Sequence, residues 1–147
     1  MIMHSDDPVV DNPTEWVAQH IKRYVESDGA DGHRYHGYDS LLLTTRGRKS
    51  GRLRRTALIY GQDAGDYILV ASNGGADHHP AWYLNLLEDP EVHIQVGPDK
   101  FPAHARTATD EEKPRLWRLM VSVFPMYAGY QKKTARPIPV IIISPDR

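Results

Sequence analysis

Short runs of apolar residues, separated by polar and turn residues, recur along most of the chain. Runs of about four to eight residues that are rich in β-branched or aromatic side chains are typical of β-strands. The alternation of polar and apolar residues over 91–96 is that of a strand with one buried face. The predicted strands cover residues 41–45, 53–60, 67–71, 91–96, 101–107 and 138–144, with turns over 61–66 and 97–100.

A helix near the N-terminus is predicted from its boundary residues. Asn12 is a good N-cap, Pro13 suits the first helical position, and Glu15 completes a capping box. Apolar and aromatic residues then recur at helical spacing from Trp16 onward, and Gly29 is a natural stop.

Two further segments, residues 80–88 and 110–124, predict helices, and Pro114 is compatible with the second only in its first turn. Six or so strands with only two helical links favour a mainly antiparallel sheet over a doubly wound one. We therefore predict an α+β fold in which the sheet forms a barrel and the helices pack outside it.

Length and composition predict one globular domain. The chain has 147 residues, of which 40% are hydrophobic and 25% charged. The expected organisation is one domain over 1–147, with an N-terminal helical segment at 1–37 and the barrel core at 38–147. The absence of cysteine excludes disulfides and thiolate chemistry. The first residues do not have the pattern of a secretory signal, so we expect a cytoplasmic protein.

Positive charge is concentrated in one short segment. The whole chain has 18 Lys and Arg against 19 Asp and Glu, yet residues 46–55 contain six cations and no acid. Two glycines and a serine in the same segment predict a tight turn whose amides could help to hold an anion. Such a segment could be a solvated face, a nucleic-acid contact or a site for a phosphorylated small molecule. No aromatic residue is interleaved for base stacking, so we expect no nucleic-acid partner. The phosphate interpretation assigns four ligands, Arg48, Lys49, Ser50 and Arg54.

A second anion-friendly loop follows the predicted strand 67–71. Ser72, Asn73, Gly74, Gly75 and Ala76 form a glycine-rich loop just before the predicted helix 80–88. Adjacent glycines permit positive φ and close approach of the backbone to a ligand, and a helix N-terminus attracts anions. Two such loops in one small chain suggest a single extended, polyanionic ligand.

The order of these motifs resembles that of the deazaflavin (F420)-dependent nitroreductase family. The resemblance runs from about Leu41 to the C-terminus, and several motifs in register are more specific than any one of them. The matching segments are LLTTRGRKSG at 42–51, VASNGGA at 70–76, PAWYLNL at 80–86, YAGYQ at 127–131 and RPIPV at 136–140.

The resemblance implies a split β-barrel that binds reduced coenzyme F420 and passes a hydride to a small electrophile such as a quinone, an enone or a nitroaromatic compound. The coenzyme has a deazaflavin ring at one end and a phosphate with a poly-glutamate tail at the other, which suits one concentrated basic turn. By position, the turn would hold the phosphate and tail, and the loop 72–76 would lie beside the ring. Trp82 and Asn85 would shape the cofactor site and hydrogen-bond there, and the alternative for Trp82 is ordinary core packing.

The same resemblance implies the catalytic groups. Hydride addition leaves negative charge on the acceptor, so a hydrogen-bond donor placed there lowers the barrier. Tyr127 and Tyr130 match the substrate-pocket tyrosines of the family, and Ser72 matches a serine near the ring. Our hypothesis is that Tyr127 orients or protonates the substrate, supported by Tyr130 and Ser72. The alternative is that these residues only pack.

The chain departs from the family pattern at three positions. Phe124 and Ile59 stand where well-studied members carry tyrosines, which predicts a more apolar pocket and makes reduction of bicyclic nitroimidazoles doubtful. Asn73 replaces a common lysine. The N-terminal acids Asp6, Asp7 and Asp11 predict peripheral membrane contact at most.

Two alternatives from other classes stay open. One is a split-barrel protein that binds FMN, and the other is a deazaflavin carrier without turnover. The histidines do not have the spacing of a catalytic zinc site, so we expect no metal. The chain could be a monomer or a homodimer.

Overall fold

The structure is a computed structural model that describes residues 9–146. The nine strands in this range are β1 Val9–Asp11, β2 Arg34–Tyr35, β3 Tyr38–Arg46, β4 Leu53–Ile59, β5 Gly61–Asp63, β6 Asp66–Val70, β7 Glu91–Val96, β8 Asp99–Thr107 and β9 Val140–Pro145. The helices are α1 Glu15–Glu26, α2 Ala81–Glu88, α3 Lys113–Val123 and α4 Met126–Lys132, and a 3₁₀ turn, η1, covers Asn73–Gly75.

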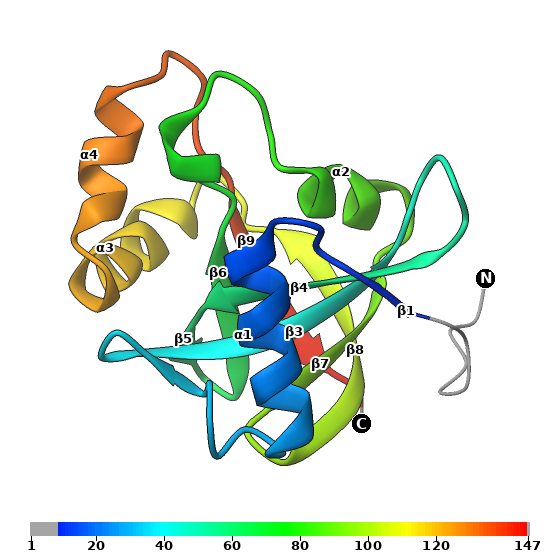
Figure 1. Cartoon of the computed structure of the whole chain (residues 1–147). Helices are drawn as coiled ribbons and strands as arrows, with labels where there is room; N and C mark the ends of the chain where they lie inside the picture. Colours follow the sequence, from blue (N-terminus) through cyan, green and yellow to red (C-terminus); the bar gives the residue numbers. More distant parts are fainter. Residues whose placement is uncertain (1–8, 147) are drawn as a thin grey trace.

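One sheet joins almost all of the strands. Its order is β1-β4-β3-β7-β8-β9-β6-β5, and β2 pairs with β3 beside this path. Every pairing is antiparallel except that of β1 with β4. Figure 1 shows α1 lying across the sheet, with α3 and α4 together on one side and α2 apart from them. The predicted α+β fold with a mainly antiparallel sheet is confirmed.

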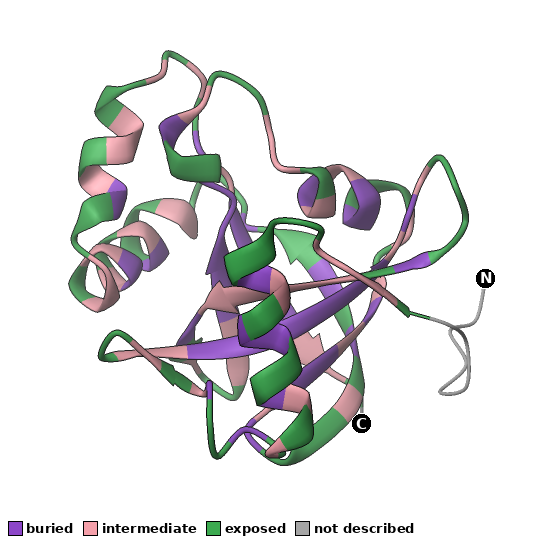
Figure 2. Cartoon of the chain, viewed as in Figure 1, coloured by how far each residue is buried: buried purple, intermediate pink, exposed green. Residues whose placement is uncertain are grey.

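The alternation of side chains along β3 separates two cores. Leu41 and Leu43 are fully buried in the cluster inside the sheet, where they meet residues such as Ile94 and Ile141. Leu42 points to the opposite face and packs with α1. A strand that is apolar on both faces is expected where both faces are covered. The buried strands and the inward side of α1 are visible in Figure 2.

A third cluster packs α3 and α4 against the sheet. Leu116 and Met120 of α3 are fully buried there with Ile138, and Tyr127 of α4 joins them. This packing places α4, a helix of only seven residues, beside the sheet. An isolated helix of that length would be unstable in water, so tertiary contacts hold it.

Tyr24 anchors α1 to the sheet. Its single hydroxyl hydrogen is shared between the carbonyl oxygens of Ser40 and Gln95, and its oxygen accepts from the backbone N–H of Gly97 at 2.7 Å. Burial raises the pKa of the Tyr24 hydroxyl. Just beyond the helix, Gly29 has φ +87°, and a Cβ there would lie 2.3 Å from the Cα of Gly97. Only glycine fits at that crossing, which fixes how α1 leaves the sheet.

Several boundaries differ from the sequence expectation. The first helix starts at Glu15 with Thr14 as its N-cap, because Asn12 uses its Oδ1 to accept from the Thr14 N–H instead of capping the helix. The predicted turn 61–66 is a hairpin that contains β5. Pro114 lies in the first turn of α3, as its chemistry requires. The short elements β1, β2 and α4 were not predicted. No helix within residues 9–146 is long and apolar enough to cross a membrane.

Candidate functional site

A cavity of about 1350 Å³ lies between the β3–β4 hairpin, η1, α2, α4 and the N-terminal elements. Small-molecule pockets typically enclose roughly 300–1,000 Å³, so this one has room for an extended ligand and a second molecule. Figure 1 shows the β3–β4 turn on one side of α2 and α4 on the other, so the two walls described below are well separated.

Cations line the wall at the β3–β4 hairpin. The turn is closed by backbone hydrogen bonds, from the Gly47 N–H to Arg52 and from the Gly51 N–H to Gly47. Ser50 accepts the Arg52 N–H at 3.2 Å with its Oγ, which leaves its hydroxyl hydrogen available to a ligand. Of the six cationic residues in 46–55, four line the cavity, and they are Arg48, Lys49, Arg54 and Arg55.

Asn85 ties this hairpin to α2. The side chain of Asn85 is almost fully buried, and its Oδ1 accepts from both the backbone N–H and the Nη1 of Arg48 at 3.2 and 3.3 Å. Its Nδ2 donates to the Oγ1 of Thr45 at 3.2 Å. The polar atoms of Asn85 are thus engaged within the protein. Although Asn85 lines the cavity, its visible role is to position Arg48.

The N-terminal strand covers one of the hairpin cations. β1 runs parallel to β4, and the carboxylate of Asp11 accepts from Nε and Nη2 of Arg55 at 2.6 and 3.2 Å. Both side chains are partly buried, and both line the cavity. Asp11 therefore balances the charge of Arg55, and the cations left for a ligand at this wall are Arg48, Lys49 and Arg54. Asp6 and Asp7 lie outside the described residues.

The loop that follows β6 forms the middle of the cavity wall. Three consecutive residues, Asn73, Gly74 and Gly75, have positive φ, and Asn73 is held there by a hydrogen bond from its Nδ2 to the carbonyl of His78. A Cβ on Gly74 would meet nothing within 4 Å, whereas one on Gly75 would lie 2.8 Å from the carbonyl oxygen of Tyr130. Gly74 thus borders the cavity, and Gly75 lets α4 pack against the loop.

An aromatic wall stands beside α4. Phe124 is at the centre of this wall, with its ring centroid 4.9 Å from those of Tyr38 and Tyr127 and 6.3 Å from that of Tyr130. All four rings line the cavity. Lys133 places its ammonium over the Tyr130 ring, 5.5 Å from the ring centroid. The π face of an aromatic ring attracts a cation in this position.

Tyr127 is the most enclosed hydroxyl of this wall. The residue is 6% exposed, and within residues 9–146 its hydroxyl has no hydrogen-bond partner. Burial raises the pKa of the Tyr127 hydroxyl, and the neighbouring Tyr130 adds to this. The phenol is therefore a neutral donor well into the alkaline range. This favours orientation of a ligand oxygen over transfer of the phenol proton.

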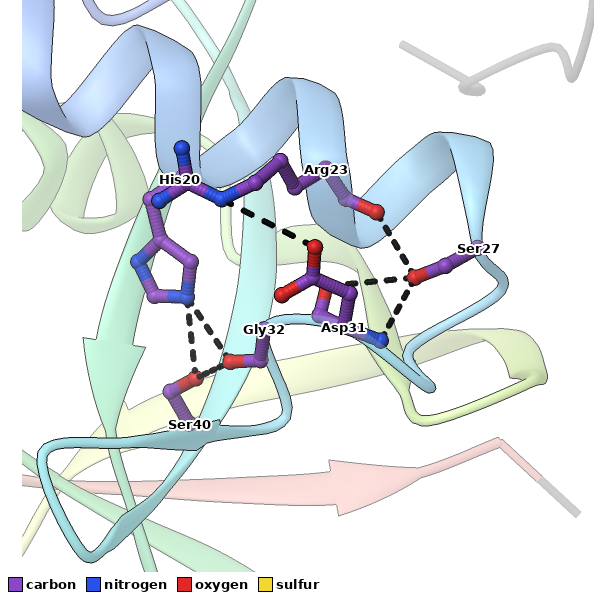
Figure 3. A network of polar contacts seen from close by, with 6 residues as sticks. All are labelled: His20, Arg23, Ser27, Asp31, Gly32 and Ser40. Atoms are coloured by element: carbon purple, nitrogen blue, oxygen red, sulfur yellow. Dashed lines mark hydrogen bonds and ion pairs between the residues drawn. The ribbon is translucent and has the colours of Figure 1, made fainter.

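The N-terminal third of the chain supplies a wall that sequence reasoning missed. Trp16, Tyr35 and His20 stack in a row, with centroids 6.0 Å apart from Trp16 to Tyr35 and 4.3 Å apart from Tyr35 to His20. Figure 3 shows how His20 is held, since its Nε2 meets the carbonyl of Gly32 at 2.8 Å, which Ser40 also approaches. Trp16 is 59% exposed and borders the cavity instead of filling the core.

Most of the residues predicted for the site lie together in this one cavity. Gly75 and Ala76, the last two residues of the loop, do not line it, and Gly75 faces α4 instead. The residues that sequence reasoning did not assign include Arg55, His78 and His79 and the row of three aromatic rings described above. Helical spacing after Trp16 signalled only Trp16 and His20 of that row, and it does not tell which side of a helix faces a ligand. The predicted residues that line the cavity are Arg48, Lys49, Ser50, Arg54, Ser72, Asn73, Gly74, Trp82, Asn85, Tyr127 and Tyr130.

Comparison with known proteins identifies the family. The model of the F420H2-dependent quinone reductase family matches residues 16–145. The chain belongs to this family. The F420H2-dependent quinone reductase Rv1261c of Mycobacterium tuberculosis strain H37Rv is 40% identical over 144 residues, which cover 89% of this chain and 97% of the relative. The predicted F420 family and reductase activity, with coenzyme F420 as the cofactor, are confirmed. The FMN alternative is not supported.

Solved structures agree with this assignment. A chain described as an F420-H2 dependent reductase, FDR-A, is 42% identical with a TM-score of 0.67, covering 71% of this chain and 93% of that one. A second, described as a domain-swapped dimer, is 40% identical with a TM-score of 0.69, covering 90% and 100%. HutZ from Vibrio cholerae, at 17% identity and a TM-score of 0.58, covers 74% of this chain and 82% of its own and shares the fold. The predicted split β-barrel is confirmed.

Proposed function

We propose that the reductase transfers a hydride from F420H2 to a quinone bound between the deazaflavin ring and the aromatic wall of the cavity. The observation that carries the proposal is the division of one cavity into two walls of different chemistry. Arg48, Lys49 and Arg54 line the hairpin side, and the rings of Tyr127 and Tyr130 line the α4 side. A ligand that is anionic at one end and planar at the other matches this division.

The donor set of the hairpin fits the anionic end of the coenzyme. A phosphate and a glutamate tail accept charge-assisted hydrogen bonds, and Arg48 and Arg54 can each present a planar fork of donors. Lys49 and the Ser50 hydroxyl add donors at the same turn. Asp11 faces Arg55 and not these three cations, so their charge is available to the ligand.

The side chains around the ring supply position and electrostatics. Bound F420H2 would supply a hydride, which carries two electrons. One proton from water would complete reduction of a quinone to a hydroquinone, and the oxidised coenzyme would release its remaining proton to water. Ser72 and Gly74 border the cavity at the loop, and Trp82 adds an apolar wall from α2. The hydroxyl of Tyr127 donates to the quinone oxygen on which negative charge develops, with Tyr130 and Ser72 as supporting donors.

The composition of the aromatic wall favours a quinone over a nitroimidazole. Phe124 and Ile59 both line the cavity, and neither offers a hydrogen bond. A planar, largely apolar acceptor with two carbonyl oxygens needs few donors and gains from stacking on aromatic rings. A bicyclic nitroimidazole carries more polar groups, which this wall would leave without partners.

The decisive experiment mixes purified protein with F420H2 and follows reoxidation of the coenzyme with menadione as the acceptor. We expect saturable binding of the coenzyme and menadione-dependent reoxidation, while FMN and NADPH in parallel samples give neither. Binding of F420H2 without reoxidation by any quinone would contradict the proposed turnover and favour a deazaflavin carrier instead. Retention of FMN in place of F420 would contradict the cofactor.

We further propose a homodimer as the working assembly. The 40% identical chain described as a domain-swapped dimer supports this. Light scattering during size-exclusion chromatography tests it, because a mass near twice the 16.7 kDa of the chain is expected. A mass near that of one chain at micromolar concentration would contradict it.

A further inference from the structure

Arg136, between α4 and β9, holds the loop that borders the cavity. Its Nε donates to the carbonyl of Ala76 at 2.9 Å, its Nη2 to that of Ser72 at 2.8 Å, and its Nη1 to that of Ala71 at 3.3 Å. Backbone oxygens before and after the three positive-φ residues are thus gathered on one guanidinium. Arg136 fixes the path of this loop, although it does not line the cavity itself.

The fourth contact of Arg136 reaches a side chain that does line the cavity. Its Nη1 lies 3.1 Å from Nδ1 of His79. A guanidinium has five N–H donors and no acceptor, so the contact is a hydrogen bond only if Nδ1 of His79 carries a lone pair. A neutral imidazole with a bare Nδ1 has its proton on Nε2. The identity of the partner therefore determines the tautomer.

The surroundings of His79 keep the ring neutral and in place. Burial lowers the pKa of the His79 imidazole, and the adjacent charge of Arg136 lowers it further. The ring packs against Tyr83 of α2 with centroids 4.9 Å apart. Within residues 9–146 no hydrogen bond involves Nε2 of His79. The ring is held at one nitrogen, and its N–H donor is left for a ligand.

We propose that Arg136 is a positioning residue that fixes His79 as the Nε2–H tautomer, so that His79 donates a hydrogen bond to an acceptor atom on the deazaflavin ring of F420. The inference rests on the proposed function. The ring is the preferred partner because its carbonyl oxygens and bare nitrogens are neutral acceptors. A phosphate or a glutamate would instead favour an imidazolium, which the charge of Arg136 opposes.

Two substitutions at His79 separate a ligand contact from a packing role. The Oδ1 of asparagine lies as many bonds from the backbone as the Nδ1 of histidine, so His79→Asn can still accept a hydrogen bond from Arg136. The asparagine side chain is too short, however, to place a donor where Nε2 of His79 lies. The Nε2 of glutamine lies as many bonds from the backbone as the Nε2 of histidine, so His79→Gln keeps a hydrogen-bond donor at that position. His104→Asn is a matched control, because His104 is exposed on β8, pairs with Asp146 and does not line the cavity.

The first measurement is the nitrogen NMR spectrum of the histidines in ligand-free protein at pH 7.5, with His79 assigned by its loss in His79→Gln. We expect an unprotonated Nδ1 and a protonated Nε2 in the wild type. In Arg136→Lys, which lacks the planar fork, the signals should move toward a mixture of tautomers. A protonated Nδ1 in the wild type would overturn the inference, whether or not any variant folds.

The second measurement is the affinity for F420, followed by the change in coenzyme fluorescence. Loss of one neutral hydrogen bond predicts that His79→Asn binds F420 about fivefold more weakly, and that His79→Gln recovers to within about twofold of the wild type. Wild-type affinity in His79→Asn would overturn the inference, as would a change confined to the KM for menadione. A wild type that shows the expected tautomer but binds no F420 would instead overturn the proposed function, and the ligand of His79 with it.

Discussion

At the hairpin, the cavity wall consists of Arg48, Lys49 and Arg54, which lie close together in the sequence. Beside α4, the wall joins Phe124 and Tyr127 to Tyr38, which comes from a distant part of the sequence. The hairpin cations sit on one turn closed by its own backbone hydrogen bonds. The aromatic rings hold one another, with centroids 4.9 Å apart. Charge acts over several ångströms and tolerates imprecise geometry, whereas ring packing does not. The difference predicts that the hairpin governs affinity for the coenzyme and the aromatic wall governs turnover.

The largest expected effect is at the hairpin. Arg48→Ala combined with Arg54→Ala should weaken F420 binding about 100-fold, since each residue is proposed to provide a charge-assisted hydrogen bond, which is worth about tenfold in affinity. The loss should shrink as salt is raised, because screening already weakens the wild-type contacts. Fluorescence titration of the coenzyme measures both.

Arg52→Ala is the matched control for this experiment. Arg52 lies in the same hairpin and is exposed, but it does not line the cavity. We expect its removal to change F420 affinity by no more than about twofold, as for a surface charge. Equal losses in Arg52→Ala and Arg54→Ala would show that general charge, and not the arrangement of the wall, attracts the coenzyme.

The second effect concerns stability where the loop meets α4. Gly75→Ala should lower the free energy of unfolding by about 2 kcal/mol, because it strains a residue at φ +84° and crowds the carbonyl of Tyr130. Gly74→Ala, at φ +64° with open space around the Cβ, should cost only about 1 kcal/mol. Urea unfolding measures both. Equal losses of unfolding free energy in the two variants would mean that α4 shifts to accommodate the added methyl group, and that the aromatic wall is less rigid than its packing suggests.

The third effect separates turnover from binding. Tyr127→Phe should lower kcat with menadione about tenfold while leaving F420 affinity unchanged, since it removes a donor to the acceptor and no contact to the anionic tail. Tyr83→Phe is the control, because the Tyr83 hydroxyl bonds to Thr107 and does not line the cavity. A weaker affinity for the coenzyme with unchanged kcat would reverse the roles assigned to the two walls.

The smallest expected effect is that of pH on the contribution of Tyr127 to turnover, which should stay constant. Because burial raises the pKa of Tyr127 above its ordinary value of about 10, the hydroxyl keeps its proton throughout the neutral and mildly alkaline range. The ratio of kcat between the wild type and Tyr127→Phe should therefore stay level from pH 7 to about 10. Using a ratio cancels other groups that titrate in both proteins. A ratio that falls near pH 8 would point to a phenol with a lowered pKa.

The same contrast explains what could be predicted from the sequence. The hairpin and the glycine-rich loop are each contiguous, so residue type and spacing predicted Arg48, Lys49 and Gly74 from local chemistry alone. The tyrosines of α4 were assigned only through the family resemblance. Their helix was not predicted, because seven residues give too little periodic signal.

Other parts of the site depend on long-range contacts that no local pattern encodes. β1 has three residues and pairs in parallel with β4, and this pairing brings Asp11 to Arg55. Trp16 reaches the cavity because Tyr24 and Gly29 fix where α1 crosses the sheet. The contact between Arg136 and His79 joins residues 57 positions apart and could be found only in the folded chain.

Asn85 also bears on the thermodynamics of ligand entry. Because its side chain already holds both the backbone and the guanidinium of Arg48, part of the ordering that a phosphate would otherwise impose is present before the ligand arrives. The unfavourable entropy of coenzyme association should therefore be smaller than it would be if Arg48 were a mobile surface side chain. Since Asn85 lies on α2 with Trp82, the proposed capture of the tail and placement of the ring would also share one rigid support.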